Sequence, residues 1–132
     1  MNDAVGLKKQ LITSHGFPEE HVTVLLDEEA TSTNIRKELA KLTLTQVEID
    51  DRIVIFYAGH GTTKKGLRGE IGYLVPYDAN PLDPSTLIRW NEFTTLSDAI
   101  RAKHILFIMD ACYGGLAITR SMGLVACESL MT

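Results

Sequence analysis

The chain has 132 residues, of which 45% are hydrophobic, and it carries a formal net charge of -4. This length and apolar content are enough for a single domain over residues 1–132 with a buried core. The excess of 17 acidic over 13 basic residues argues against a nucleic acid or an anionic membrane as partner. No apolar run reaches the roughly 18 residues of a membrane span, and the residues after Met1 do not resemble a secretory signal.

The chain has two cysteines, Cys112 and Cys127, which are too few for a disulfide framework. It has no CxxC pair and no group of histidines at the spacing of metal ligands. We therefore expect reduced thiols in a cytoplasmic protein, with no metal and no cofactor.

The first predicted element is a helix over residues 4–15, because Ala4, Leu7 and Leu11 recur at helical spacing and Gly16 can end it. A short branched-rich run at residues 22–26 then predicts a buried strand. Residues 31–34 offer several N-cap side chains, and the apolar pattern after them predicts a second helix that ends near Gln46.

A second buried strand is predicted at residues 53–57, and it ends at Gly59, His60 and Gly61. Residues 62–72 are polar and glycine-rich, which predicts a loop before a short strand at 73–75. A third helix carries an apolar stripe near residues 93–100, and a third strand at 105–108 ends at Asp110, Ala111 and Cys112. Strands that alternate with helices predict an α/β fold of three layers, with a mostly parallel sheet flanked by helices.

His60 and Cys112 follow two of these strands, and function in open parallel sheets gathers beyond the carboxyl ends of the strands. A thiol becomes a strong nucleophile when an imidazole takes its proton. Gly59 and Gly61 let the backbone bend around His60, and the amides of Gly61 and Cys112 can face an oxyanion. The alternative is that Cys112 is an ordinary core cysteine, because free cysteines are usually buried.

Two segments, residues 56–61 (FYAGHG) and 109–115 (MDACYGG), resemble the two signature blocks of the caspase-like cysteine peptidases. The histidine precedes the cysteine by 52 positions, close to the roughly 50 that are typical of caspases. Residues 74–79 and the Asn2-Asp3-Ala4 segment are similar to further family segments. The resemblance implies an endopeptidase that acts on protein or peptide substrates, with Cys112 as nucleophile and His60 as its acid–base partner.

Asp110 stands where true caspases have glutamine, so the chain is more similar to metacaspases and their bacterial relatives. In those proteins, an aspartate two residues before the cysteine and another in the Asn-Asp-Ala segment line a pocket for arginine or lysine. The resemblance implies that Asp110 and Asp3 bind substrate, since a partly desolvated carboxylate favours a cation. The alternative is that Asp110 caps its loop and that Asp3 is an ordinary acidic residue at a helix N-terminus.

Many metacaspases need calcium, which is held by acidic residues before the third helix and after the cysteine. The corresponding residues 87–90 and 116–119 contain no carboxylate, whereas calcium requires about six to eight oxygen ligands. We therefore expect no calcium requirement.

The family also has an interior strand before the Asn-Asp-Ala segment and further strands after the cysteine. The resemblance therefore implies an incomplete fold, with a gap between the strands at 22–26 and 53–57 and an open sheet edge. A complementary C-terminal portion or subunit is the partner that this implies. The alternative to an enzyme is a truncated or degenerate domain that is inactive alone and acts as a binding or regulatory module.

Overall fold

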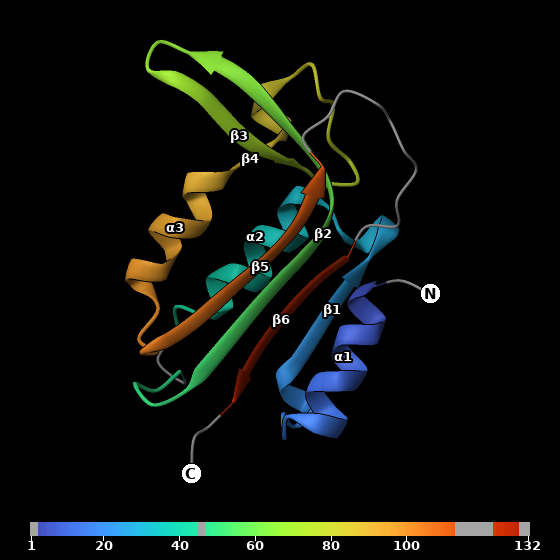
Figure 1. Ribbon diagram of the computed structural model, residues 1–132, viewed down its shortest axis with the longest axis vertical. Coiled ribbons are helices and arrows are strands. Elements are labelled where there is room, and N and C mark those ends of the chain that lie inside the picture. The colour runs from blue at the N-terminus through green and yellow to red at the C-terminus, as the bar shows by residue number, and fades with distance from the viewer. Residues whose placement is uncertain (1–2, 45–46, 113–122, 130–132) are drawn as a thin grey trace.

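The computed structural model describes residues 3–44, 47–112 and 123–129, of which 111–112 and 123–129 are described by their backbone. This part of the chain forms three α-helices around one sheet (Figure 1). The helices are α1 (Asp3–Ser14), α2 (Ser32–Lys41) and α3 (Trp90–Ala99). The strands are β1 (Val22–Leu26), β2 (Arg52–Gly66), β3 (Gly69–Val75), β4 (Ile88–Arg89), β5 (His104–Cys112) and β6 (Gly123–Ser129). Short 3-10 helices lie at Glu19–His21, Asp27–Glu29 and Pro84–Thr86.

The three predicted helices are confirmed, and their ends follow from local chemistry. Gly16, just after α1, has a φ of 73°, a left-handed conformation that glycine adopts without strain. The side chain of Thr31 accepts a hydrogen bond from the amide of Asn34 at 3.2 Å and so caps the start of α2. That helix ends at Lys41, earlier than the predicted end near Gln46.

The sheet is mixed, so the prediction of a mostly parallel sheet is wrong. Its strands follow the order β1-β6-β2-β3-β4, and β5 pairs with β2 as a branch from this path. Among the pairs described, β2 with β5 is parallel and the other four are antiparallel. The difference arises because β2 turns back directly into β3, and because β6 runs against both of its neighbours.

The predicted loop at residues 62–72 is instead the tip of a hairpin formed by β2 and β3. Gly66 pairs with Gly69 across a two-residue turn, and the φ of Gly69 is 122°, which disfavours any other residue there. Thr62 and Thr63 lie in the ladder, where β-branched residues are favoured. The glycines of this segment therefore mark the end of a hairpin and not an irregular loop.

The expected gap between the first two predicted strands is absent, because β6 fills it. Val22 of β1 and Val54 of β2 both pair with Cys127 of β6. This strand was not predicted, because the segment after Tyr113 shows no clear apolar period in the sequence. The expected open edge is at β5, which among the described strands pairs with β2 alone.

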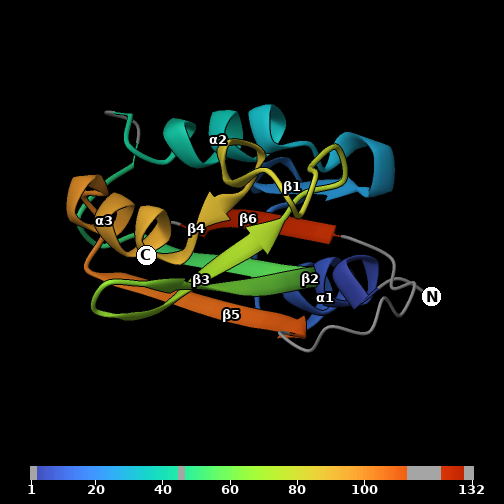
Figure 2. The ribbon, with the colours of Figure 1, turned by 90° about the horizontal axis from the view of Figure 1, so that it is seen from above.

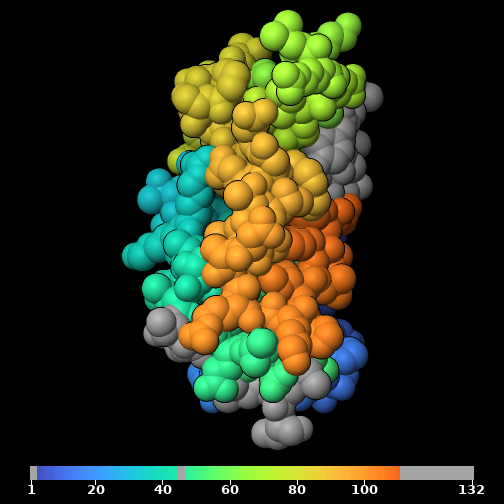
Figure 3. Space-filling model, turned by 90° about the vertical axis from the view of Figure 1, so that its left-hand side faces the viewer, coloured from blue at the N-terminus to red at the C-terminus, as the bar shows by residue number. Residues whose placement is uncertain are grey.

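Helices cover both faces of the sheet, as predicted (Figure 2). Odd-numbered residues of β2, such as Ile55 and Tyr57, are buried with α2 and α3. Even-numbered residues, such as Phe56 and Ala58, are buried with α1. In Figure 3, α2, α3 and β5 lie side by side below the β2–β3 hairpin. None of the described helices is long and apolar enough to cross a membrane.

Trp90 begins α3 and packs its ring against aromatic side chains in the core. Its centroid lies 6.0 Å from that of Phe93 and 6.3 Å from that of Phe107, which joins α3 to β5. Aromatic contacts of this kind add stability beyond their buried area. Trp90 is therefore a packing residue that holds α3 against β5.

Candidate active site

The parallel pairing of β2 and β5 brings the predicted histidine and cysteine to the same level of the sheet. His60 of β2 lies directly opposite Cys112, the last residue of β5. Neighbouring strands are about 4.8 Å apart, which is within reach of an imidazole and a thiol on adjacent strands. The two residues are thus neighbours, although 52 positions separate them in the chain.

His60 lies inside a strand and not beyond its end, in contrast to the prediction. One edge of β2 pairs with β6 as far as Ala58, and with β3 from His60 onward. His60 is therefore paired with Val75 on one side and with Cys112 on the other. This is the point at which β2 exchanges one neighbour for another.

A buried tyrosine holds the backbone at this point. The hydroxyl of Tyr57 donates toward the carbonyl oxygen of His60 at 3.0 Å and toward that of Val75 at 3.2 Å. A Cβ atom at Gly59 would lie 2.8 Å from the same hydroxyl. Gly59 is thus required by this close approach to the tyrosine, and not by the sharp bend that the sequence predicts. Gly61 also lies within the ladder, opposite Leu74.

The two predicted substrate-binding aspartates lie on different elements. Asp110 is exposed near the end of β5, opposite Ala58 of β2. Asp3 is the first residue of α1. Ala4, next to Asp3, belongs to the same buried cluster as Ala58. Ala4 and Ala58 thus lie in one buried cluster, on the α1 face of the sheet.

Cys127 has a different environment along the sheet. Its partner Val54 is six positions before His60 on β2, which corresponds to about 20 Å along a strand. The backbone thus separates the second cysteine from the histidine and brings Cys112 next to it.

Comparison with known proteins places this chain among the peptidases that the two motifs resemble. A family model described as the caspase domain matches residues 1–128. The chain belongs to the caspase family. Metacaspase-4 of Arabidopsis thaliana is 34% identical to this caspase domain over 127 residues, and Metacaspase-7 of the same plant is 29% identical over the same length. Metacaspase III c of the diatom Phaeodactylum tricornutum is 27% identical over 128 residues.

These alignments cover 87 to 89% of the caspase domain described here but 29 to 37% of the three relatives. The chain thus spans about a third of the length of the curated relatives it matches. No solved structure matched the chain.

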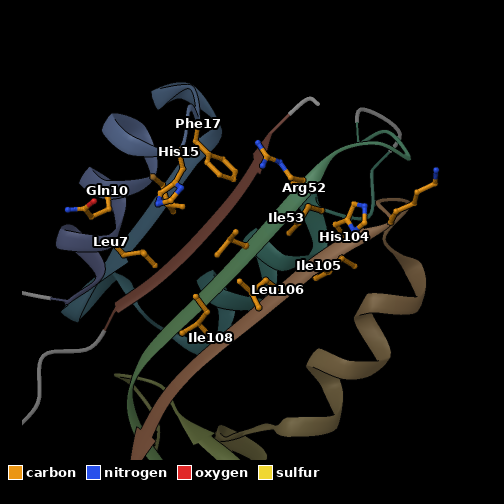
Figure 4. A pocket seen from close by; sticks show the side chains of 13 residues that line it. Leu7, Gln10, His15, Phe17, Arg52, Ile53, His104, Ile105, Leu106 and Ile108 are labelled. Atoms are coloured by element: carbon orange, nitrogen blue, oxygen red, sulfur yellow. The ribbon is translucent and has the colours of Figure 1, made fainter. Parts of the chain in front are cut away.

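A groove of about 550 Å³ lies between α1 and the first halves of β2 and β5, at the far end of these strands from His60 (Figure 4). Its apolar surface includes Leu106, which is 54% exposed. Arg52, Lys103 and His104 also line it, whereas no carboxylate of the described residues does. Parallel strands are normally covered on both faces, so this part of the caspase domain has an unusually exposed sheet face.

A second cavity, of about 370 Å³, lies where the β2–β3 hairpin meets Trp90 and Met109. Met109 directly precedes Asp110 on β5, and successive side chains of a strand point to opposite faces of the sheet, so this cavity and Asp110 lie on different faces. Within the described ranges, no three histidine, cysteine, aspartate or glutamate residues are grouped so as to hold a metal ion. Residues 116–119, which the calcium prediction also uses, lie outside those ranges.

Proposed function

We propose that this caspase domain is a cysteine endopeptidase in which Cys112 and His60 form the catalytic dyad. The observation that carries the proposal is the register of β2 and β5, which pairs these two residues directly. A core cysteine has no need of an imidazole on the neighbouring strand, whereas a catalytic thiol requires one.

The chemistry follows from this pairing. The imidazole of His60 takes the proton of the Cys112 thiol, and the thiolate attacks the carbonyl carbon of the scissile peptide bond. The amides of Gly61 and Cys112 donate hydrogen bonds to the resulting oxyanion. The imidazolium then protonates the departing amine, and water hydrolyses the thioester to release the acid and restore the thiol.

The proposed specificity is cleavage after arginine or lysine. Asp110, two positions before Cys112, supplies a carboxylate beside the reacting bond, and Asp3 is proposed as a second one. The membership of Ala4 and Ala58 in one buried cluster supports a location of both aspartates on the same face of the sheet. A carboxylate pair in a partly desolvated site favours a guanidinium or ammonium group and disfavours an anion.

The proposed partner is a complementary C-terminal portion, supplied by the same polypeptide or by a separate subunit. Two observations support it: β5 pairs with β2 alone among the described strands, and the groove beside Leu106 is apolar with cations around it. A strand added to β5 and an amphipathic helix with acidic residues would match these surfaces. Until this portion is bound, the chain would be a poor enzyme, and its exposed surfaces would serve for binding.

The proposed nucleophile is tested with a thiol-reactive peptide inhibitor that carries arginine next to its reactive group. Labelled protein is digested, and the modified cysteine is located by mass spectrometry. We expect modification of Cys112, reduced by orders of magnitude in His60→Ala, since activation of the thiol depends on the imidazole. Labelling of Cys127 with Cys112 unmodified would refute the assignment.

A further inference from the structure

We propose that Tyr57 is a positioning residue for His60: its hydroxyl fixes the His60 backbone relative to Val75, and thereby aims the imidazole at the end of β5. This inference rests on the proposed Cys112–His60 dyad. It assigns a role in the reaction to a buried side chain that does not contact the substrate.

The first support is the location of the hydroxyl. Tyr57 is 1% exposed, and its ring packs in the core formed with α2 and α3. Its hydroxyl has one proton but lies at 3.0 and 3.2 Å from two carbonyl oxygens, those of His60 and Val75. These two residues are partners across the β2–β3 ladder. A single hydroxyl therefore bridges the two strands at the level of the proposed catalytic histidine.

The second support is the change of neighbour that β2 makes here. Among the described residues, the β6 ladder ends at Ala58 and the β3 ladder begins at His60, so Gly59 between them pairs with Ala111 of β5 alone. The change of neighbour therefore falls directly before His60, which is paired with Val75 on this edge and with Cys112 on the other. The Tyr57 hydroxyl supplies a fixed point at this position, where backbone rotation would turn the imidazole away from Cys112.

The third support is the space that the hydroxyl requires. A side chain at Gly59 would place its Cβ 2.8 Å from the Tyr57 oxygen and 3.0 Å from the ring carbon that carries it. Both distances are at or below the closest approach that real Cβ atoms make, so a methyl group there would displace the tyrosine. Gly59 and Tyr57 thus act together to set the His60 backbone.

The experiment follows the pH dependence of Cys112 alkylation by iodoacetamide, read by peptide mass spectrometry, which needs no turnover. A thiol that exchanges its proton with a nearby imidazole reacts well below the ordinary thiol pKa of about 8.5. We compare the unaltered protein, His60→Ala, Tyr57→Phe and the control Tyr73→Phe. Tyr73 is a buried tyrosine on β3 whose hydroxyl has no hydrogen bond to a described residue.

We expect the Tyr57→Phe profile to move toward that of His60→Ala, with alkylation near pH 6 slowed on the order of ten- to hundredfold, since a misplacement of about 1 Å has effects of this size. Tyr73→Phe should keep the original profile. Circular dichroism and the thermal midpoint establish that each variant is folded. If Tyr57→Phe does not fold, Gly59→Ala takes its place, and the same shift is expected because the methyl group displaces the hydroxyl.

Suppose that His60→Ala changes the pH profile of Cys112 alkylation, but Tyr57→Phe (or its substitute Gly59→Ala) keeps the profile of the unaltered protein. This result would overturn the role of Tyr57 and leave the proposed dyad standing. Identical profiles for the unaltered protein and His60→Ala would instead overturn the proposed dyad, and the role of Tyr57 with it. The two failures are therefore distinguishable in one set of measurements.

Discussion

Asp110 is the residue on which the proposed specificity depends, because it is exposed at the end of β5 close to Cys112. We expect Asp110→Asn to lower kcat/KM for substrates with arginine or lysine before the cut by roughly ten- to hundredfold, since a charge-assisted contact is worth about 1.5–3 kcal/mol. A fluorogenic peptide series that varies this one substrate residue measures the effect.

The control for Asp110 is the reactivity of Cys112 toward iodoacetamide, which the Asp110→Asn change should leave within a few-fold. If both carboxylates contact the substrate cation, Asp3→Asn should also lower kcat/KM for substrates with arginine or lysine before the cut. A preference of the unaltered protein for aspartate before the cut would refute the basic site.

Individual site residues differed in how far the sequence alone could place them. The adjacency of His60 and Cys112 was predictable, because each follows an apolar run of residues and the adjacency needs only that the two strands run parallel. The hydrogen bond from Tyr57 to Val75 was not predictable, because it joins residues 18 positions apart through a hairpin that the sequence predicts as a loop. Gly59 was noticed, but the reason for it requires knowing where the tyrosine hydroxyl lies.

At the scale of elements, the turn before β2 offers a stability test with an adjacent control. Asp51 is 2% exposed, and its carboxylate accepts a hydrogen bond from the amide of Glu48 at 2.8 Å. Asp51→Ala leaves that amide without its partner, so we expect unfolding free energy to fall by about 1–3 kcal/mol. Urea denaturation followed by circular dichroism gives the value.

The control is Asp50→Ala, one position earlier. Asp50 and its partner Lys103 are both exposed, with 3.4 Å between the charged atoms, and pairs of this kind contribute about 0–1 kcal/mol. Equal losses for Asp50→Ala and Asp51→Ala would show that the buried hydrogen bond is not what stabilises the turn.

Elements with a strong local signal were predicted, and those that depend on distant partners were not. The helices and β1 were found from apolar spacing and from caps such as Thr31. The β2–β3 hairpin was missed because its outer part is polar and exposed, although Gly66 and Gly69 mark its turn. β6 was missed because its partners, β1 and β2, lie far away in the sequence.

At the scale of the whole molecule, the exposed groove and the edge of β5 predict that this 132-residue chain is a poor enzyme alone. The proposed C-terminal portion would complete the substrate site and fix the placement of His60 and Cys112, and small misplacements reduce rates by about a hundredfold. We expect specific activity to rise by at least that factor when a complementary C-terminal portion is added or fused. Equal, high activity with and without it would show that no further portion is needed.

A variant of the groove separates docking from catalysis. Leu106→Glu places a charge on the exposed apolar face of β5, far along the strand from Cys112. We expect it to abolish the stimulation by the added portion while Cys112 alkylation of the isolated chain stays unchanged. Stimulation that survives Leu106→Glu would exclude the groove as the docking surface.

The position of β6 also has a consequence for biosynthesis. Val22 of β1 pairs with Cys127, so β1 leaves the ribosome about 100 residues before its partner strand is made. At roughly 5–20 residues per second, the edge of β1 stays unpaired for on the order of 5–20 seconds. Exposed apolar strand edges of this kind associate with other chains. Nascent chains arrested before residue 123 should therefore be digested readily by protease and retained by chaperones, and resistance should appear only once residue 129 has cleared the exit tunnel.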